Sequence, residues 1–404
     1  MLRMRLSPGL VQGDNRPTVP LLAFFLASFA WNYGLGMTYV VVPLYAHSQG
    51  LSGVEIGLLF TMPVFAQVVF NLLGGAWTDR VGGRRIMLAS CWLLAGGALA
   101  LLIAHGFWML FAGQLLLVLG RATYWPATWA LASELPGVRS VQLGRLNSTT
   151  NFGQIVGTSS AGFILAASGF TASFLTLAGM GFAAFALGLA TREPARKAGG
   201  HAGGVFAGYR ELLRLRIMFY AMLCAYLSAL PFSLAMSFYP LLLKEYGFAE
   251  QASGLLIALR AVGAIGAGLL LARFVKSGPA SLAPVVAGLG VALSVGLLPL
   301  VNHAAPIAAW MLVAGVGSSV MTLYFQITMS EVSSLAQRGS ALALGGFGWG
   351  LSHLSTPLAM GWFADRFDMA TGYYVLGGFA VLWSVLIGVL RPWAFTRTAG
   401  TRPA

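Results

Sequence analysis

Long apolar runs separated by short polar segments occupy most of the chain. Runs long enough to cross a hydrocarbon layer of roughly 30 Å, at about 1.5 Å of rise per residue, occur twelve times. The pattern therefore predicts an all-α membrane protein with twelve transmembrane helices. The predicted spans are 20–44, 52–76, 86–104, 107–132, 142–167, 172–190, 217–243, 251–273, 281–300, 306–330, 341–362 and 370–390.

The composition agrees with this pattern. Charged residues make up 9% of the 404 residues, hydrophobic residues make up 58%, and the mean hydropathy is +0.79. No soluble domain sustains such values. Cys91 and Cys224 both fall inside apolar runs, so we expect neither a disulfide framework nor a zinc site.

Polar side chains divide the spans into two groups. Asn, Gln, His and charged side chains avoid lipid, and every third span, beginning with 86–104, contains none of them. We expect these four spans to face lipid and the others to surround a polar cleft. The seventh span, 217–243, also lacks such residues. We place it at the cleft only because it contains Ser228, Ser233 and Tyr239.

Arg121 is the most informative single residue, because it lies about 21 Å from the outer end of its span. An arginine at that depth costs at least about 2.5 to 3.5 kcal/mol. It either binds an anionic or carbonyl-rich substrate or relays protons, or it is held structurally by backbone carbonyls, Asn and Gln. Arg260 and His353 each lie about 14 Å from the outer ends of their spans, and His353 is either a satisfied hydrogen-bond partner or a group that titrates.

Other residues at this depth complete a predicted substrate site. Asn and Gln side chains supply hydrogen bonds, and aromatic side chains either stack on an amphipathic substrate or pack between helices. The predicted substrate-binding residues are Asn32, Arg121, Tyr124, Trp125, Gln154, Arg260, Trp349 and His353. None of the eleven carboxylates is at the midplane, so a coupled proton would be carried by Glu55, Asp79 or His353, or by the substrate itself.

The basic residues predict the topology. Of the 24 Lys and Arg residues, twenty lie in segments on the side of the N-terminus, while only Lys244 and Arg366 lie on the opposite side. The positive-inside rule then places both termini in the cytoplasm, in a multi-pass protein of the cytoplasmic (inner) membrane. The formal charge of +13 therefore reflects this topology, and we expect no nucleic-acid partner.

The chain also repeats itself. A shift of 197 residues places Pro43-Leu44 on Pro240-Leu241 and Ser133-Glu134 on Ser330-Glu331. Two related six-helix bundles suit a transporter, because one half can rock against the other around a site at the midplane. We predict bundles at 1–190 and 217–404, joined by a cytoplasmic linker at 191–216 that is rich in Gly, Ala, Arg and Lys.

One polar stretch, Gly75 to Arg85 with the sequence GAWTDRVGGRR, joins the second and third spans. It resembles the corresponding loop of the major facilitator superfamily, which has a glycine, three residues, Asp-Arg, any residue, Gly and a basic pair. Gly83 is one residue more than that pattern has. The resemblance implies the two-bundle fold of the family and a cytoplasmic gate; a structural salt bridge with a positive-inside anchor is the alternative. The predicted gating residues are Gly75, Asp79, Arg80, Gly82 and Arg84.

The fifth span is similar to that of drug-proton antiporters in the same family. Gly144, Gly153, Gly157 and Gly162 have the spacing of their glycine pattern, although Thr158 replaces its proline. Ordinary helix packing also uses small residues at such spacing. A span-4 arginine recurs in the family as well, but Tyr124 and Trp125 stand where glutamine and glycine are usual.

Three functions remain open. The first is proton-coupled export of small amphipathic molecules, and the second is uptake of an organic anion by the buried arginines. The third, an intramembrane enzyme or receptor, has no support from paired carboxylates, a Ser-His-Asp set or metal-ligand spacing. No G-x-x-x-x-G-K-[ST] stretch supports nucleotide-driven transport. We expect a monomer in the lipid bilayer that binds a small molecule, uses protons as the candidate coupling ion, and needs no cofactor.

Overall fold

The computed structural model describes residues 19–136, 138–191, 212–332 and 338–396. All regular elements in these ranges are helices, so the all-α prediction is confirmed. The first half contains α1 (Val19–Ser48), α2 (Gly53–Val81), α3 (Gly83–Leu102), α4 (Gly106–Glu134) and α5 (Arg139–Leu189). The second half contains α7 (Arg216–Ser237), α8 (Tyr239–Glu245), α9 (Glu250–Leu270), η1 (Ala272–Phe274), α10 (Ala283–Gly296), η2 (Leu298–Leu300), α11 (Ala304–Val332), α12 (Arg338–Arg366) and α13 (Met369–Phe395).

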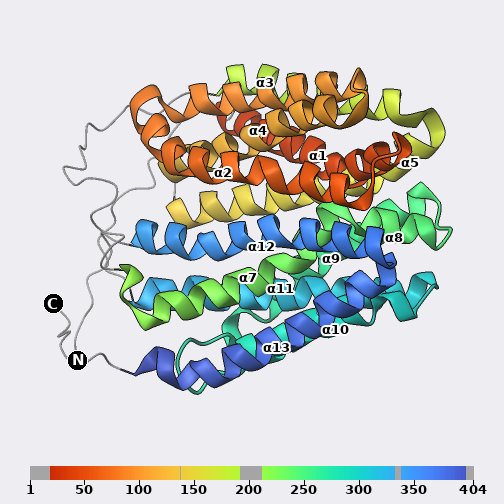
Figure 1. Cartoon of the computed structure of the whole chain (residues 1–404). Helices are drawn as coiled ribbons and strands as arrows, with labels where there is room; N and C mark the ends of the chain where they lie inside the picture. Colours follow the sequence, from red (N-terminus) through yellow and green to blue (C-terminus); the bar gives the residue numbers. More distant parts are fainter. Residues whose placement is uncertain (1–18, 137, 192–211, 333–337, 397–404) are drawn as a thin grey trace, which may run out of the picture.

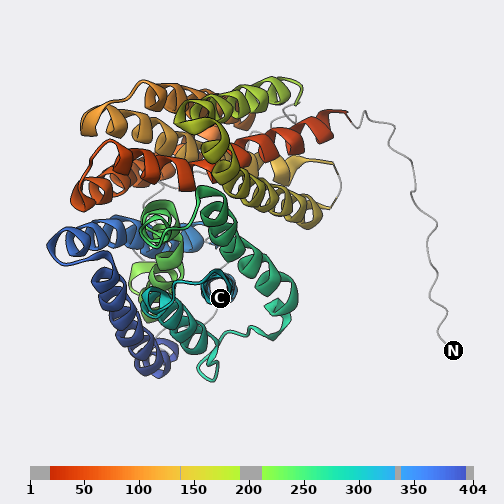
Figure 2. The same ribbon diagram turned by 90° about the vertical axis from the view of Figure 1, so that its right-hand side faces the viewer.

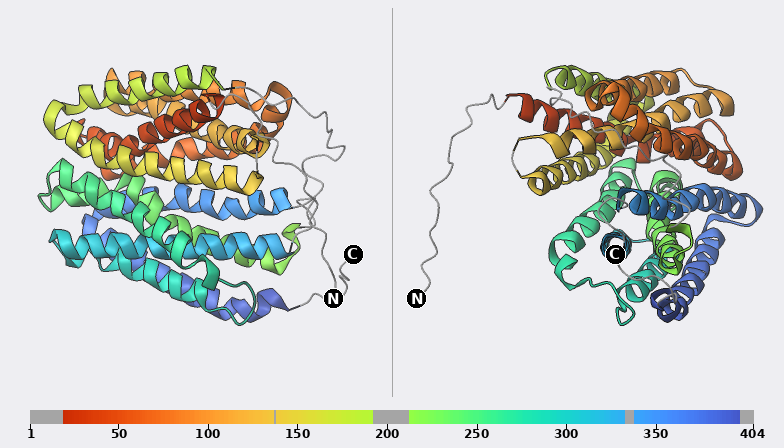
Figure 3. Two further views of the ribbon diagram at one scale, coloured as in Figure 1. Left: turned by 180° about the vertical axis from the view of Figure 1, so that it is seen from behind. Right: turned by 90° about the vertical axis from the view of Figure 1, so that its left-hand side faces the viewer.

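These helices make twelve membrane crossings, as the apolar runs predict, but they divide them differently. Helix α5 is 51 residues long and crosses twice, because Gly169 reverses the chain inside it with a φ of 74° (Figure 3). Glycine adopts this left-handed conformation without the steric cost that a side chain brings. The predicted loop between residues 167 and 172 is therefore a turn at one residue.

The seventh crossing is made by two helices. α7 ends at Ser237 and α8 begins at Tyr239, with Phe238 between them. Pro240 has no N–H to donate to the carbonyl of Met236, so the regular ladder of the helix is interrupted here. The break lies next to residues of the site described below.

The helices form two groups, one from each half of the sequence (Figures 1 and 2). The two groups meet along a seam where α2 packs on α12 and α5 packs on α9. We call the end of the molecule at which α1 and α7 begin the first end, and the end at which α1 stops and α2 begins the second end. The predicted two-bundle fold class is thereby confirmed, while the boundaries at 1–190, 191–216 and 217–404 stay a prediction.

Four crossings lie away from the seam, and they are the four predicted to face lipid. α3, the second limb of α5, α10 and α13 expose large apolar side chains, such as Leu382, which is 71% exposed. α3, α10 and α13 pack only on helices of their own half. Lipid would cover these faces, which explains why the spans contain no strongly polar residue.

The polar stretch between the second and third crossings is more helical than the sequence suggests. α2 continues through Asp79 and Arg80 to Val81, and α3 starts at Gly83. Only Gly82 lies between them, with a φ of 100°. The connection between the second and third crossings is therefore a single glycine with a positive φ, which a side chain would disfavour.

Candidate functional site

Arg121 lies in the middle of α4 and is 6% exposed. Its Nη2 donates a hydrogen bond of 2.6 Å to the Oε1 atom of Gln67 on α2. Its Nη1 donates to the Sδ atom of Met236 on α7, 3.3 Å away. Nε is buried without a hydrogen-bond partner among the described atoms. The guanidinium therefore bridges the two halves while its own donors are incompletely used.

Arg260 is the buried cation of the other half. It lies in the middle of α9, is 8% exposed, and places its Cζ atom 4.9 Å from the ring centre of Phe232 on α7. The ring face offers partial compensation for the charge. Its Nε, like that of Arg121, has no partner among the described atoms. In the described part of the chain, no carboxylate forms an ion pair with either arginine.

A layer of aromatic rings lies beside Arg260. Phe232 lies 5.4 Å from Trp349 and 5.5 Å from His353, and the last two rings stack at 5.2 Å. Trp349 donates its indole N–H to the Oγ atom of Ser228, at 2.8 Å. The rings therefore form a fixed apolar wall contributed by α7 and α12.

The imidazole of His353 has a defined orientation. Its Nδ1 lies 2.9 Å from the carbonyl oxygen of Trp349. A carbonyl oxygen only accepts, so the proton of the neutral ring is on Nδ1 and Nε2 remains an acceptor. Both Arg121 and Arg260 interact electrostatically with this ring. His353 is thus part of the same cluster as the two arginines.

Tyr39 on α1 completes the cluster. Its ring meets that of Phe232 edge to face at 5.5 Å, and its hydroxyl is buried without a hydrogen-bond partner among the described residues. It interacts electrostatically with both Arg121 and Arg260. A buried hydroxyl without a partner among the described residues is a ready donor or acceptor for a ligand.

We call Tyr39, Arg121, Phe232, Arg260, Trp349 and His353 the central cluster. Its members come from α1, α4, α7, α9 and α12, and therefore from both halves. Sequence reasoning found four of the six. Tyr39 and Phe232 were missed because the chain contains 12 Tyr and 26 Phe, and nothing in their spacing separates them from core residues.

Asn32, Tyr124 and Gln154 form a second group inside the first half. The Nδ2 atom of Asn32 donates to the hydroxyl of Tyr124 at 3.1 Å, and Gln154 donates to the Oδ1 atom of Asn32 at 3.0 Å. The ring of Tyr124 stacks on Trp31 with centroids 3.8 Å apart. We call this group the Asn32 network; its members bond to one another, and Asn32 also donates to the carbonyl of Ser28. Trp125 lies at its edge, 5.4 Å from Tyr124.

Of the predicted coupling and gating residues, His353 belongs to the central cluster, whereas Glu55 and Arg84 lie apart from it. Glu55 accepts hydrogen bonds from the backbone N–H and hydroxyl of Ser52, at 2.9 and 3.0 Å, while Ser52 accepts from the N–H of Glu55. This reciprocal capping box starts α2 at the second end. Arg84 donates to the carbonyl of Leu189 at 2.6 Å. The surroundings of Gly75 and the side chains of Asp79 and Arg80 lie outside the described part of the structure.

The four glycines of the fifth crossing have different surroundings. A Cβ added at Gly157 would overlap the carbonyl of Tyr33 on α1, and one at Gly162 would overlap that of Glu250 on α9. A Cβ at Gly153 would lie 2.7 Å from the carbonyl oxygen of Phe29. Gly144 has open space around it. Three of the four therefore serve close helix packing.

The contacts between the halves are tight at the second end. Thr61 of α2 donates to the carbonyl of Leu354 on α12 at 2.9 Å, and a Cβ at Gly254 of α9 would lie 2.7 Å from the carbonyl of Thr158 on α5. Along their described residues, α4 and α11 make no extended contact at the first end. The molecule is therefore closed at the second end.

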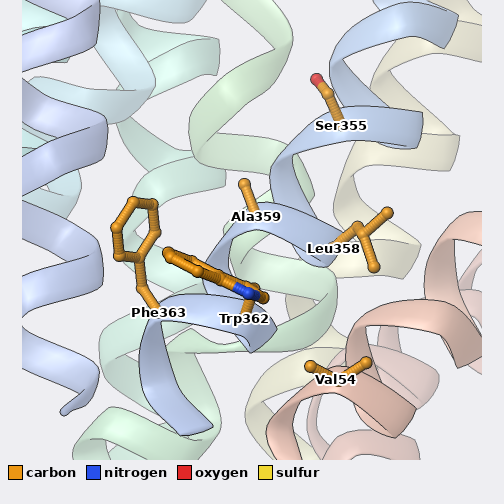
Figure 4. Close-up of a pocket in the computed structure, with 6 residues that line it drawn as sticks. All are labelled: Val54, Ser355, Leu358, Ala359, Trp362 and Phe363. Atoms are coloured by element: carbon orange, nitrogen blue, oxygen red, sulfur yellow. The ribbon is translucent and has the colours of Figure 1, made fainter. Parts of the chain in front are cut away.

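A hollow of about 470 Å³ lies near this closed end, at the seam of α2 and α12. It is lined by Val54, Ser355, Leu358, Ala359, Trp362 and Phe363 (Figure 4). None of these residues belongs to the central cluster. The lining is almost entirely apolar and offers no charge to a substrate, so the candidate site is the central cluster and not this hollow.

Known proteins resemble the chain in sequence. A family model described as the Major Facilitator Superfamily matches residues 21–332 and 221–403. The quinolone resistance protein NorA of Staphylococcus aureus is 23% identical over 133 residues, which are 32% of this chain and 34% of that protein. The multidrug resistance protein MdtH of Klebsiella pneumoniae is 30% identical over 114 residues, 27% of this chain and 28% of that protein. The matches thus span about a third or less of these relatives.

Solved structures resemble the chain over nearly its whole length. A peptide transporter, POT, in complex with sulfate has a TM-score of 0.74 at 15% identity and covers 94% of this chain and 95% of its own. A D-xylose-proton symporter has a TM-score of 0.73 at 16% identity, with 91% and 96% covered. An inward-facing bacterial homolog of the human lysosomal transporter Spinster has a TM-score of 0.72 at 16% identity. The match covers 93% of this chain and 95% of that one. At these identities the likeness shows the fold alone.

Proposed function

Because the chain belongs to the major facilitator superfamily and is a multi-pass secondary transporter, we propose that its substrate is a small organic anion with an aromatic or apolar body. The observation that carries this proposal is the pair of buried arginines, one from each half. Neither Arg121 nor Arg260 forms an ion pair in the described residues. A buried cation without a partner is costly, and an anionic substrate would supply the missing charge.

The geometry also supports the apolar part of the substrate. Phe232 and Trp349 form an aromatic wall beside Arg260, and an aromatic ring of the substrate would stack there. The free hydroxyl of Tyr39 would hydrogen-bond to the anionic group. Since the arginines come from opposite halves, a bound anion would draw the halves together, as alternating access around a midplane site requires.

A second candidate function is export of drug-like molecules in exchange for protons. It is supported by the resistance proteins among the relatives and by the partial glycine pattern of the fifth crossing. Glu55 lies in a capping box, and no carboxylate of the described residues touches the central cluster. The basic segments support cytoplasmic termini in the inner membrane, so that the site would be closed toward the outside.

A ligand-binding experiment separates these functions. The purified protein in lipid nanodiscs is heated with 2-naphthoate, with its neutral analogue 2-naphthalenemethanol, or with tetraphenylphosphonium. Binding of an organic anion predicts that only 2-naphthoate raises the melting temperature, and that Arg121→Gln and Arg260→Gln abolish the shift. Arg273→Gln, which removes an exposed arginine outside the cluster, should keep it.

The outcome that overturns the proposal is stabilisation by the cation alone. That result would favour drug export, and proteoliposomes would then show accumulation of the cation driven by a pH gradient. The assigned site would likewise be contradicted if 2-naphthoate still raised the melting temperature of both Arg121→Gln and Arg260→Gln. The direction of transport follows from two rates in right-side-out vesicles. One is the uptake of labelled naphthoate, and the other is its release from preloaded vesicles.

A further inference from the structure

A short sequence pattern occurs twice in this chain. Gly75 to Arg80 reads GAWTDR and Gly361 to Arg366 reads GWFADR, so that both have a glycine, three residues and Asp-Arg. The first copy lies at the end of α2, and the second is the end of α12. α2 and α12 come from different halves and pack side by side along the seam (Figure 1). They run in opposite directions, so the two copies lie at opposite ends of one helix pair.

The second copy makes a direct bond between the halves. The Oδ1 atom of Asp365 accepts a hydrogen bond from the backbone N–H of Gly53 at 2.6 Å, and Oδ2 accepts from that of Val54 at 2.8 Å. Gly53 and Val54 are the first residues of α2, where N–H groups have no partner within their own helix. Both the hydrogen bonds and the positive end of the helix dipole favour a carboxylate here.

The glycine of the second copy allows this contact. A Cβ added at Gly361 would overlap the carbonyl oxygen of Gly53, and one added at Gly53 would lie 2.7 Å from Oδ1 of Asp365. Only glycine on both helices permits so close an approach. Gly361 therefore allows the two helices to come close, and Asp365 accepts the hydrogen bonds that join them.

We infer that Asp365 and Gly361 are a latch that holds the second end closed, and that the transporter must break both hydrogen bonds to open there. In the open state α12 separates from the start of α2, and the carboxylate and the two N–H groups become hydrated. The first copy, with Asp79, ends α2 and therefore lies at the first end of the same helix pair. The device is independent of the substrate and of the function proposed above.

Spin-label distances test this inference. Cys91 and Cys224 are replaced by alanine, and labels are placed at His105→Cys and Asn302→Cys, which lie in loops of different halves at the second end. A second pair, Val138→Cys and Ala280→Cys, reports on the first end. Pulsed electron resonance in nanodiscs without substrate then gives the fraction of molecules open at each end.

We expect Asp365→Ala to raise the ratio of open to closed molecules at the second end by about fivefold or more, because two hydrogen bonds to a charged group are lost. Distances at the first end should shorten together with this change. Gly361→Ala should act in the same direction by forcing the helices apart. The matched control is Asp368→Asn, because Asp368 is also exposed but bonds only to Thr371 at the start of its own helix.

Two results would overturn the latch. One is an unchanged distance distribution in both Asp365→Ala and Gly361→Ala; the other is a change no larger than that in Asp368→Asn. Size-exclusion chromatography and the melting temperature identify a variant that fails to fold. In that case Asp365→Asn, which keeps the side-chain volume and loses the charge, is measured in its place with the same expected direction.

Discussion

Arg121 donates a hydrogen bond from Nη1 to the Sδ atom of Met236, 3.3 Å away and on the other half of the molecule. A thioether sulfur is a weak acceptor, so this bond compensates little of the charge. We expect Met236→Leu to lower stability by less than about 1 kcal/mol and to leave 2-naphthoate binding unchanged or tighter. Calorimetric titration of the purified variant measures this. A large loss of affinity would mean that Met236 itself contacts the ligand.

Replacing Arg260 should separate binding from stability. Arg260→Met removes a buried cation that forms no ion pair with a carboxylate of the described residues, so we expect the unfolding free energy to rise by about 1 to 3 kcal/mol while anion binding is lost. Reversible unfolding in mixed micelles measures the first and a melting-shift assay the second. Arg273→Met at the exposed arginine is the control. A loss of stability in Arg260→Met would show that protein groups already compensate the charge.

The Asn32 network should behave as a structural unit. Tyr124→Phe removes the hydroxyl that accepts from Asn32, which still donates to the carbonyl of Ser28 at 2.9 Å. We expect a loss of about 1 kcal/mol in stability with the anion affinity unchanged. Thermal unfolding and binding are measured on the same preparation. A tenfold change in affinity at unchanged stability would place Tyr124 in the substrate site instead.

Close packing at Gly157 should be sensitive to a single methyl group. Gly157→Ala places a Cβ against the carbonyl of Tyr33, and we expect it to cost about 1 to 3 kcal/mol. Gly179→Ala, also inside α5 but with open space around it, should be neutral or stabilising by up to about 1 kcal/mol. Melting temperatures of the two variants test the difference, and equal values would contradict it.

The start of α13 should show a dependence on pH. The backbone N–H and hydroxyl of Thr371 donate to Asp368 and lower the pKa of this carboxyl below its usual value. A lowered pKa in the folded state gives stability that is full above the unfolded pKa, about 3.9, and is lost as the pH falls through the folded value. The melting temperature of Asp368→Asn should therefore be lower than that of the parent protein at pH 7. The difference between the two melting temperatures should shrink below about pH 4. A gap that does not depend on pH would contradict this assignment.

The sequence predicted the helices and the outer faces well, because lipid imposes a simple rule on each residue. Of the five spans without Asn, Gln, His or charge, four are outer crossings, namely α3, α10, α13 and the second limb of α5. The exception is α7, which is buried between other helices. Arg121, Arg260 and His353 were found for the same reason, since a strongly polar side chain at that depth needs an explanation. The predicted spans place Arg121 about 21 Å and the other two about 14 Å from the outer ends, so depth alone did not predict that the three meet in one cluster.

The rest could not be predicted because it depends on contacts between distant segments. Asp365 looked like one of several carboxylates at a helix end, and only the position of α2 shows that it caps another helix. Tyr39 and Phe232 are aromatic residues among many. Asn32, by contrast, was grouped with Arg121 by depth, although its hydrogen bonds go to Tyr124 and Gln154.

The reversal at Gly169 ties the fifth and sixth crossings into one mechanical unit. The inner limb of α5 packs against α1 and α9, while the outer limb faces lipid. With a single residue between the limbs, neither can slide or tilt without dragging the other. Each transport cycle must therefore displace the surrounding bilayer, and the thickness and fluidity of the membrane should set the rate at which this protein turns over.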